Sequence, residues 1–383
     1  MKPRTTCPGC GGIQLSPTWR IPRQPVVLNY RFATAAAALR VPRRDLRLAQ
    51  CGGCGLIFNA VFDSAVIPYD ECYENRQGCS AAFQAHLQAQ VRRLVRRLPA
   101  RDGRVLEVGC GKGDFLRLLC REAGARGVGY DTSYEGPPVA EDGRVRFEQH
   151  YVSAREVESP FDMVVCRHVV EHIGEIGSFL RELRAIAAAA GDPVVVIETP
   201  AFEWIAAHDC FWDVFYEHCN YFPRPSLARL CRLAGFKVER QTAVFGGQYQ
   251  WLELRVRQRC WPACKAATVV RLSPFAKRAE RMVQALEKRL RQHGAARGWA
   301  IWGAGAKGVA LVNRLHRLPP ALVVDSNAAK QGGFIPGSRV PIVAPDDPCL
   351  RDLSLVLIAN PRYAPEITCA LRQAGIAPTI LTT

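Results

Sequence analysis

Three glycines and one acidic residue form a regularly spaced group near residue 110. The glycines are Gly109, Gly111 and Gly113. They follow a predicted strand that contains Glu107, and a predicted amphipathic helix over 115–123 comes next. Glycine lets the backbone turn sharply and lie against a ligand, and the order strand, glycine turn, helix is typical of a nucleotide-binding α/β sheet. The group therefore indicates a cofactor site.

The spacing of these residues distinguishes between cofactors. A dinucleotide site requires G-x-G-x-x-G, whereas here the glycines alternate with other residues and Glu107 lies two residues before the first. This pattern resembles motif I of class I methyltransferases, which use S-adenosylmethionine. The next predicted strand ends in Asp131, where the resemblance implies that the ribose is held. A generic Rossmann turn with an incidental Glu107 is the alternative.

Four cysteines are spaced like metal ligands. Cys7 and Cys10 form one C-x2-C pair, and Cys51 and Cys54 form a second. Two such pairs supply four thiolates, which complete a tetrahedral zinc site and leave no open position for chemistry. We expect structural zinc here, with free or redox-active thiols as the alternative.

Two stretches rich in aromatic and polar residues are candidates for substrate contact. The first covers residues 69–77, and the second is an insertion over 211–222 that contains the pair Glu217 and His218. An imidazole transfers protons near neutral pH, although neighbours in sequence rarely hydrogen-bond each other. A packed surface loop and an aromatic lid with a satisfied histidine are the alternatives. The predicted substrate residues in these stretches are Tyr69, Gln77, Tyr216, Asn220 and Tyr221.

A second glycine motif lies near the C-terminus. Residues 303–308 form a G-x-G-x-x-G after a predicted strand, and Asp325 ends the following strand. The segment is short for a full dinucleotide site, which favours a mononucleotide site or a degenerate Rossmann fold. Lys307 and Lys330 are the predicted contacts to a diphosphate.

Alternating strands and helices must position these residues. Continuous apolar runs such as 194–197 predict a buried parallel sheet, and Arg167 and His168 would lie at its carboxyl edge as cofactor contacts. We favour His172 as part of the cofactor wall. Strands are expected near 25–28, 105–109, 127–131, 145–148, 162–166, 194–198, 236–245 and 249–256, and helices near 82–98, from 225, and over 274–293.

The predicted fold class is α/β, with a small N-terminal zinc-binding module, a class I methyltransferase Rossmann-like core and a C-terminal Rossmann-like domain. The expected boundaries are 1–65 for the zinc module, 66–260 for the core, 261–297 for a helical connector and 298–383 for the last domain.

Composition limits the function classes. The chain has 383 residues, with 51 Lys and Arg against 35 Asp and Glu, for a net charge of +16. The arginines are dispersed through predicted helices, so a nucleic-acid partner is unlikely on this pattern. The sequence shows no signal peptide and no apolar run long enough to cross a membrane. We therefore expect a cytoplasmic protein, with a monomer favoured.

The chain contains, in this order, two cysteine pairs, a methyltransferase-like core, an aromatic insertion and a terminal glycine unit. This arrangement resembles a family of sugar C-methyltransferases that act on nucleotide-linked deoxysugars. The resemblance covers essentially the whole chain. It implies methyl transfer from S-adenosylmethionine to the carbon beside the ketone of a 4-keto sugar. It also implies that His218 is the base, that Glu217 positions substrate or imidazole, and that the Tyr73 hydroxyl stabilises an enolate oxygen. The zinc module would shape the cleft, and the terminal domain would hold the nucleotide.

Two residues depart from the pattern of this family. Phe215 and Cys79 stand where the family has a tyrosine and a histidine. The methyl acceptor therefore stays open, and N-, O- or C-methylation of another small metabolite is an alternative. A zinc-bearing RNA-binding or RNA-modifying protein and a redox enzyme that uses the terminal glycine motif are alternatives of other classes.

Overall fold

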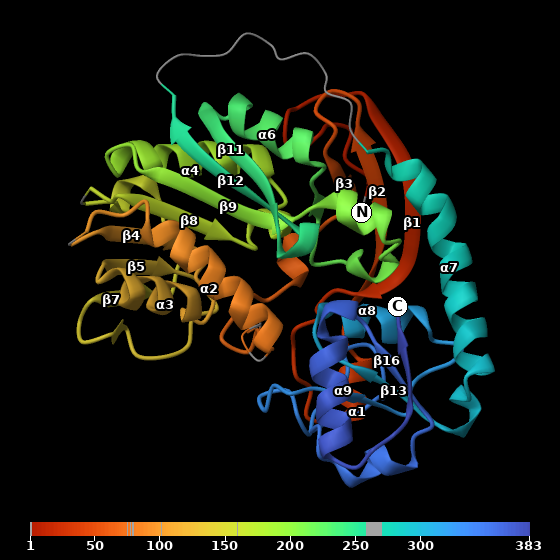
Figure 1. Cartoon of the computed structure of the whole chain (residues 1–383). Coiled ribbons are helices and arrows are strands. Elements are labelled where there is room, and N and C mark those ends of the chain that lie inside the picture. Colours follow the sequence, from red (N-terminus) through yellow and green to blue (C-terminus); the bar gives the residue numbers. More distant parts are fainter. Residues whose placement is uncertain are drawn as a thin grey trace.

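The computed structural model describes residues 2–74, 76, 78, 80–100, 102–158, 160–257 and 270–383. This part of the chain forms three sheets (Figure 1). The largest is the eight-stranded sheet β11-β12-β9-β8-β4-β5-β7-β6, whose five central strands β9, β8, β4, β5 and β7 are parallel. Its strands are β4 (Arg104–Val108), β5 (Arg126–Tyr130), β6 (Val139–Ala140), β7 (Val145–Glu148), β8 (Met163–Arg167), β9 (Val194–Pro200), β11 (Phe236–Val244) and β12 (Tyr249–Val256).

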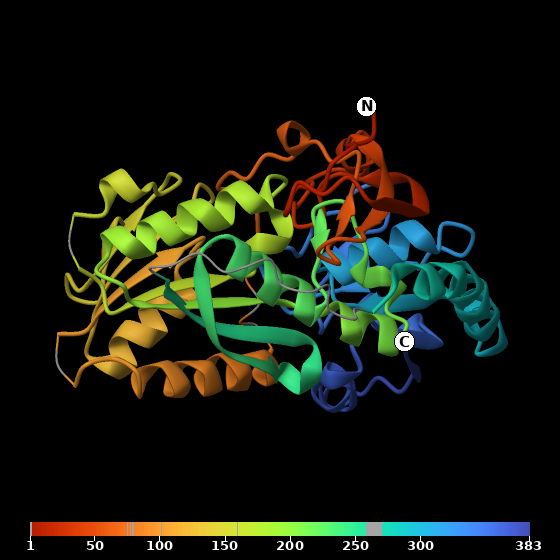
Figure 2. The same cartoon turned by 90° about the horizontal axis from the view of Figure 1, so that it is seen from above.

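Alternation along the strands places apolar side chains on both faces of this sheet. Val105 packs with residues of α2 (Ala81–Val95) and α3 (Asp114–Ala123), whereas its neighbour Leu106 packs with α4 (Ile176–Ala189) and α6 (Arg224–Leu233). The two helix layers lie on opposite sides of the sheet in Figure 2. The predicted methyltransferase-like core is therefore confirmed, with predicted strand ends correct to within two residues.

The N-terminal sheet is antiparallel and contains a strand from the distant aromatic insertion. Its order is β1-β2-β3-β10. Asn220 pairs with Phe58 and Tyr221 with Ile57, so the residues that follow His218 belong to this sheet. Its strands are β1 (Leu15–Pro25), β2 (Arg43–Cys51), β3 (Ile57–Asn59) and β10 (Asn220–Tyr221).

The prediction of a strand over 25–28 is wrong. β1 ends at Pro25, and after one more hydrogen bond, from the Val26 amide to the carbonyl of Pro42, the buried residues that follow leave the sheet. The chain then reaches the C-terminal domain, where the Phe334 amide donates to the Phe32 carbonyl. The short helix α1 (Ala35–Leu39) lies beside that domain in Figure 1.

The C-terminal domain has a five-stranded parallel sheet in the order β15-β14-β13-β16-β17, as expected for a Rossmann-like unit. The long helix α7 (Leu272–Gln292) precedes it and packs on β1, with the ring centroids of Trp19 and Phe275 5.5 Å apart. Residues 258–269, which include the start of the predicted connector, lie outside the described residues. The other elements are α5 (Phe202–Ala207), β13 (Trp299–Trp302), α8 (Ala306–Arg314), β14 (Leu322–Val324), β15 (Ile342–Val343), β16 (Leu355–Ile358), α9 (Ala364–Gln373) and β17 (Thr379–Thr382).

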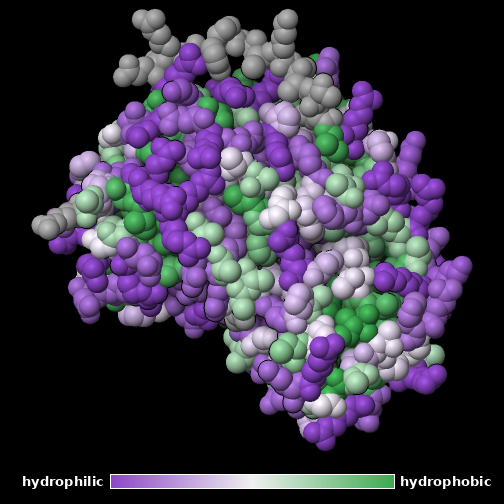
Figure 3. All heavy atoms as spheres, viewed as in Figure 1, coloured by the Kyte–Doolittle hydropathy of each residue, from purple (hydrophilic) through white to green (hydrophobic). Residues whose placement is uncertain are grey.

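The surface and helices are consistent with the composition. Hydrophilic residues cover most of the face in Figure 3, and apolar residues occur there in small groups. Across the described ranges, no helix is long and apolar enough to span a membrane.

Candidate functional site

The glycine turn between β4 and α3 is shaped by close packing. Gly109 has a φ of 74°, and a Cβ atom there would lie 2.2 Å from Cγ2 of Val169. Gly113 has a φ of 82°, and its Cβ would lie 2.5 Å from Cζ of Phe147. A side chain at either position would clash and strain the backbone. Steric packing therefore explains why glycine occurs at these two positions.

A cavity of about 1300 Å³ opens at the carboxyl edge of the large sheet and reaches the C-terminal domain. It lies beside the reversal of strand order at β4, which is where open α/β sheets bind ligands. The predicted residues that line it are Tyr69, Tyr73, Glu107, Gly109, Gly111, Asp131, Arg167, His168, His218, Lys307 and Lys330. The structure therefore brings most of the predicted site together, whereas Gly113 caps α3 and is not part of the wall.

Two residues in the wall, Glu107 and Arg167, each have one buried polar atom without a hydrogen-bond partner in the part of the chain that the structure describes. Oε2 of Glu107 and Nη2 of Arg167 are buried, and neither atom has a partner among the described residues. Burial raises the pKa of Glu107 to about 8, although Arg167 opposes this shift. Asp131 differs, because its carboxylate accepts hydrogen bonds from the Gly111 amide and from Ser133, at 2.8 Å each for the backbone donors. One acid oxygen and one guanidinium nitrogen without partners fit the amino-acid end of S-adenosylmethionine.

The imidazole of His218 lies in the same cavity. Its ring centroid is 4.8 Å from that of His172 and 4.1 Å from that of Phe215. Burial, followed by repulsion from His172 and His168, holds the pKa of His218 well below its usual range. The imidazole is therefore neutral near pH 7, which is the form that accepts a proton.

Glu217 differs from its sequence neighbour because it is completely buried and does not line the cavity. Its carboxylate accepts hydrogen bonds from the Leu28 amide and, at 2.8 Å, from the Tyr73 hydroxyl. Burial raises its pKa to about 7. Glu217 therefore positions Tyr73, and the expectation that it orients the His218 imidazole is wrong because both carboxylate oxygens bond elsewhere.

Three predicted substrate residues have structural contacts instead. The Tyr216 hydroxyl accepts from the Asp63 amide, and the Tyr221 hydroxyl bonds the backbone of Phe215. The amide of Asn220 donates to the carbonyls of Val170 and Ile173. None of the three lines the cavity, so their placement against substrate is corrected: their polar groups hold the insertion in place. Gln77, Asn75 and Cys79 lie outside the described residues.

His172 is more central than the sequence indicated. Its Nδ1 lies 3.2 Å from the hydroxyl of Tyr69, and its ring faces His218. His172 lines the cavity, and its role in a cofactor wall stays a prediction. No local sequence signal predicts the ring contact between His172 and His218.

The C-terminal glycine motif forms the far end of the cavity. The Ala304 amide donates to Oδ2 of Asp325, and Lys307 at the start of α8 lies 2.7 Å from a carboxylate oxygen of Asp213. Lys330 is buried, and its ammonium donates to the Ala304 carbonyl at 3.2 Å. Because Asp213 belongs to the aromatic insertion of the core, its ion pair with Lys307 joins the core to the terminal domain. Its role was missed because its partner lies 94 residues away.

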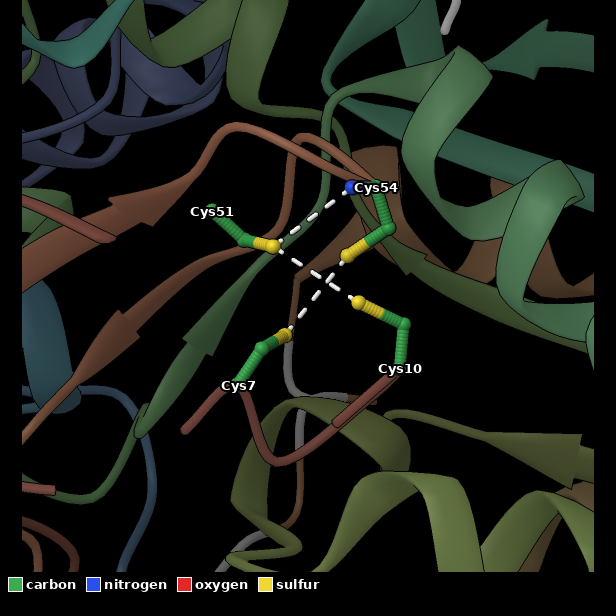
Figure 4. Close-up of side chains that lie close together, drawn as sticks. All are labelled: Cys7, Cys10, Cys51 and Cys54. Atoms are coloured by element: carbon green, nitrogen blue, oxygen red, sulfur yellow. Dashed lines mark hydrogen bonds between the residues drawn. The ribbon is translucent and has the colours of Figure 1, made fainter. Parts of the chain in front are cut away.

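The four cysteines meet as the spacing predicts (Figure 4). Their sulfur atoms lie within 4.8 Å of one another, and two pairs, Cys7–Cys54 and Cys10–Cys51, are 3.6 Å apart. Zn–S bonds of about 2.3 Å in a tetrahedron place sulfurs about 3.8 Å apart, so the cluster fits zinc.

Glu107→Ala is expected to weaken binding of S-adenosylhomocysteine by about tenfold, because it removes a charge-assisted hydrogen bond. Isothermal titration calorimetry measures this. Glu122→Ala, on the exposed side of α3, is the matched control and should leave affinity unchanged. Equal affinity of Glu107→Ala and the wild type would contradict the placement of Glu107.

Comparison with known proteins gives independent information. Residues 83–241 match a family described as methyltransferase domain, and residues 262–377 match one described as C-methyltransferase C-terminal domain. The C-methyltransferase NovU of Streptomyces niveus is 30% identical over 312 residues, which cover 74% of this chain and 72% of NovU. A ubiquinone biosynthesis O-methyltransferase of a Bradyrhizobium species is 31% identical over 26% of this chain and 41% of its own length.

Among solved structures, a Burkholderia thailandensis 1,6-didemethyltoxoflavin-N1-methyltransferase with bound S-adenosylhomocysteine is 21% identical. The match covers 47% of this chain and 80% of that one, with a TM-score of 0.34.

Proposed function

The chain belongs to the family of S-adenosylmethionine-dependent C-methyltransferases, and we propose that it methylates the carbon beside the ketone of a nucleotide-linked 4-keto-deoxysugar. The observation that carries this proposal is that the imidazole of His218 lines the same cavity as two groups of candidate binding residues. One group is Glu107 with the glycine turn, and the other is the lysine-bearing turn that contains Lys307.

Proton abstraction is the first step of the proposed reaction. The imidazole of His218 takes the proton from the carbon beside the ketone, and the C–H electrons form the double bond of an enolate. The low pKa of His218 keeps its nitrogen free at neutral pH. When bound, S-adenosylmethionine supplies a methyl group as a sulfonium electrophile, which this carbon receives.

Stabilisation of the enolate oxygen is assigned to Tyr73. Its hydroxyl is fixed by hydrogen bonds to Oε2 of Glu217 and, at 3.2 Å, from the amide of Asn29. Burial and the nearby Glu217 hold the pKa of Tyr73 well above its usual range, so the hydroxyl keeps its proton. This proton bonds Glu217 in the structure, and in the proposed reaction the hydroxyl turns it to the enolate oxygen.

Nucleotide binding is assigned to the C-terminal domain. Gly303 and Gly305 have open space where a Cβ would lie, so their backbone can approach a ligand closely. Lys307 lies beside this turn, with its ammonium paired with Asp213. Tyr69 and Lys330 complete the proposed substrate contacts, and four thiolates hold a structural zinc ion. The C-terminal match is to a methyltransferase domain, so the redox hypothesis for this motif is not retained.

We propose the domain boundaries that were predicted from the sequence. We also propose that the protein is a cytoplasmic monomer that acts on a small molecule. A methyltransferase of another small metabolite is the alternative, favoured by the apolar ring of Phe215 beside His218.

The acceptor class is tested with labelled methyl donor and a panel of nucleotide-linked keto sugars. We expect label on the carbon beside the ketone. Matched sugars that carry a hydroxyl in place of the ketone should take up no label. In deuterated water with S-adenosylhomocysteine, the keto sugar alone should take up deuterium at the same carbon. Absence of both methylated product and deuterium uptake across the panel would refute the acceptor class.

A further inference from the structure

A buried carboxylate lies directly behind the cofactor end of the cavity. Glu198, near the end of β9, is fully buried. Its Oε1 accepts a hydrogen bond from Nε2 of His86 at 2.7 Å, and its Oε2 accepts one from Nε of Arg167 at 2.7 Å. Although burial raises the pKa of Glu198, Arg167 and His86 lower it to about 2. Glu198 is therefore an ionised carboxylate that accepts hydrogen bonds from both His86 and Arg167.

The hydrogen bond from Arg167 to Glu198 fixes the guanidinium group. Arg167 is the last residue of β8, its side chain is 7% exposed, and its guanidinium carbon lies 4.0 Å from the centroid of the Phe115 ring. Nε bonds Glu198, whereas Nη2 is buried and has no partner among the described residues. A guanidinium held at one nitrogen and by one aromatic face keeps a single orientation.

Nη2 of Arg167 and Oε2 of Glu107 form a complementary pair of atoms without partners within the described ranges. Glu107 and Arg167 both line the cavity, and each has one buried polar atom without a partner. Buried polar atoms without partners are costly and therefore rare unless a ligand completes them. One acid and one guanidinium are the partners of the ammonium and carboxylate of an amino acid.

We propose that Glu198, held by His86, is a positioning residue that aims Arg167 at the carboxylate of the methionine part of the cofactor. This inference rests on the cofactor contacts assigned to Glu107 and Arg167 above. Glu198 itself does not line the cavity and acts only through Arg167.

His86 comes from outside the glycine motif and is itself tightly packed. It lies on α2, with ring centroids 4.9 Å from Phe245 and 5.6 Å from Phe83, and it is 6% exposed. The imidazole therefore has one orientation, in which Nε2 faces Glu198. Loss of this contact would remove one of the two side-chain hydrogen bonds that hold the Glu198 carboxylate.

Two ligands separate positioning from general stability. S-adenosylhomocysteine has the amino-acid end, whereas 5′-methylthioadenosine has the same adenosine and thioether without it. By calorimetry, Glu198→Gln is expected to weaken S-adenosylhomocysteine binding by about tenfold, as for one charge-assisted hydrogen bond, and to leave 5′-methylthioadenosine binding within about twofold. An equal loss for both ligands, or no loss for S-adenosylhomocysteine, would overturn the proposal.

Variants of His86 keep the test decisive if Glu198→Gln does not fold. His86→Gln retains an N–H donor for Glu198 and should keep S-adenosylhomocysteine affinity within about twofold, whereas His86→Leu should lower it by about fivefold. Equal S-adenosylhomocysteine affinities for these two variants would contradict the inference. Neither ligand contains a methyl acceptor, so a wrong acceptor class does not affect the result. A normal affinity in Glu107→Ala would instead show that the cofactor contacts are wrong.

Discussion

His218→Ala is expected to lower kcat by about 10³-fold and to leave affinity for S-adenosylhomocysteine unchanged. Removal of a general base typically costs 10²- to 10⁴-fold in rate. The imidazole lines the same cavity as the cofactor residues and the proposed nucleotide residues, and its low pKa keeps it unprotonated. Steady-state kinetics measure the rate, and calorimetry measures the affinity.

His208→Ala is the matched control for this variant. His208 is exposed, stacks on Trp204 and does not line the cavity, so its loss should change kcat by less than about twofold. Full turnover in His218→Ala would remove the proposed mechanism. Loss of S-adenosylhomocysteine binding in His218→Ala would show instead that the variant disturbs the cofactor site.

Cys51→Ser is expected to abolish binding of one zinc ion per chain and to lower the melting temperature by more than about 10 °C. A structural zinc site contributes folding free energy directly, and each kcal/mol shifts the melting temperature of a large domain by about 2–4 °C. Elemental analysis and thermal unfolding measure the two effects. Cys349→Ser removes an exposed thiol far from the cluster and is the control.

Zinc loss should also reduce turnover more than cofactor affinity. The strand β3 begins three residues after Cys54 and pairs with β10, which begins two residues after His218. Disorder in the N-terminal sheet is therefore expected to displace His218 more than it displaces the glycine turn. A metal-free wild type, or unchanged stability in Cys51→Ser, would contradict the zinc site.

The sequence alone determined the features that depend on local spacing. The glycines at 109, 111 and 113, the two C-x2-C pairs and the apolar runs each reflect constraints between residues close in the chain, such as a turn, a chelate or a buried strand. These constraints predicted the core sheet and the cysteine cluster correctly. Most of the catalytic, cofactor and substrate residues that were predicted from the sequence line the cavity.

Only the tertiary structure decided the partners of those residues. Glu217 and His218 are adjacent, yet Glu217 bonds Tyr73 and Leu28, which lie 144 and 189 residues away, while His218 faces His172. Adjacent side chains diverge along the backbone, so their neighbours are set by the packing of distant elements. The same reason hid the contact of Glu198 with His86, 112 residues earlier. Spacing in the sequence identified the chemical groups, and packing across the three sheets determined what each group does.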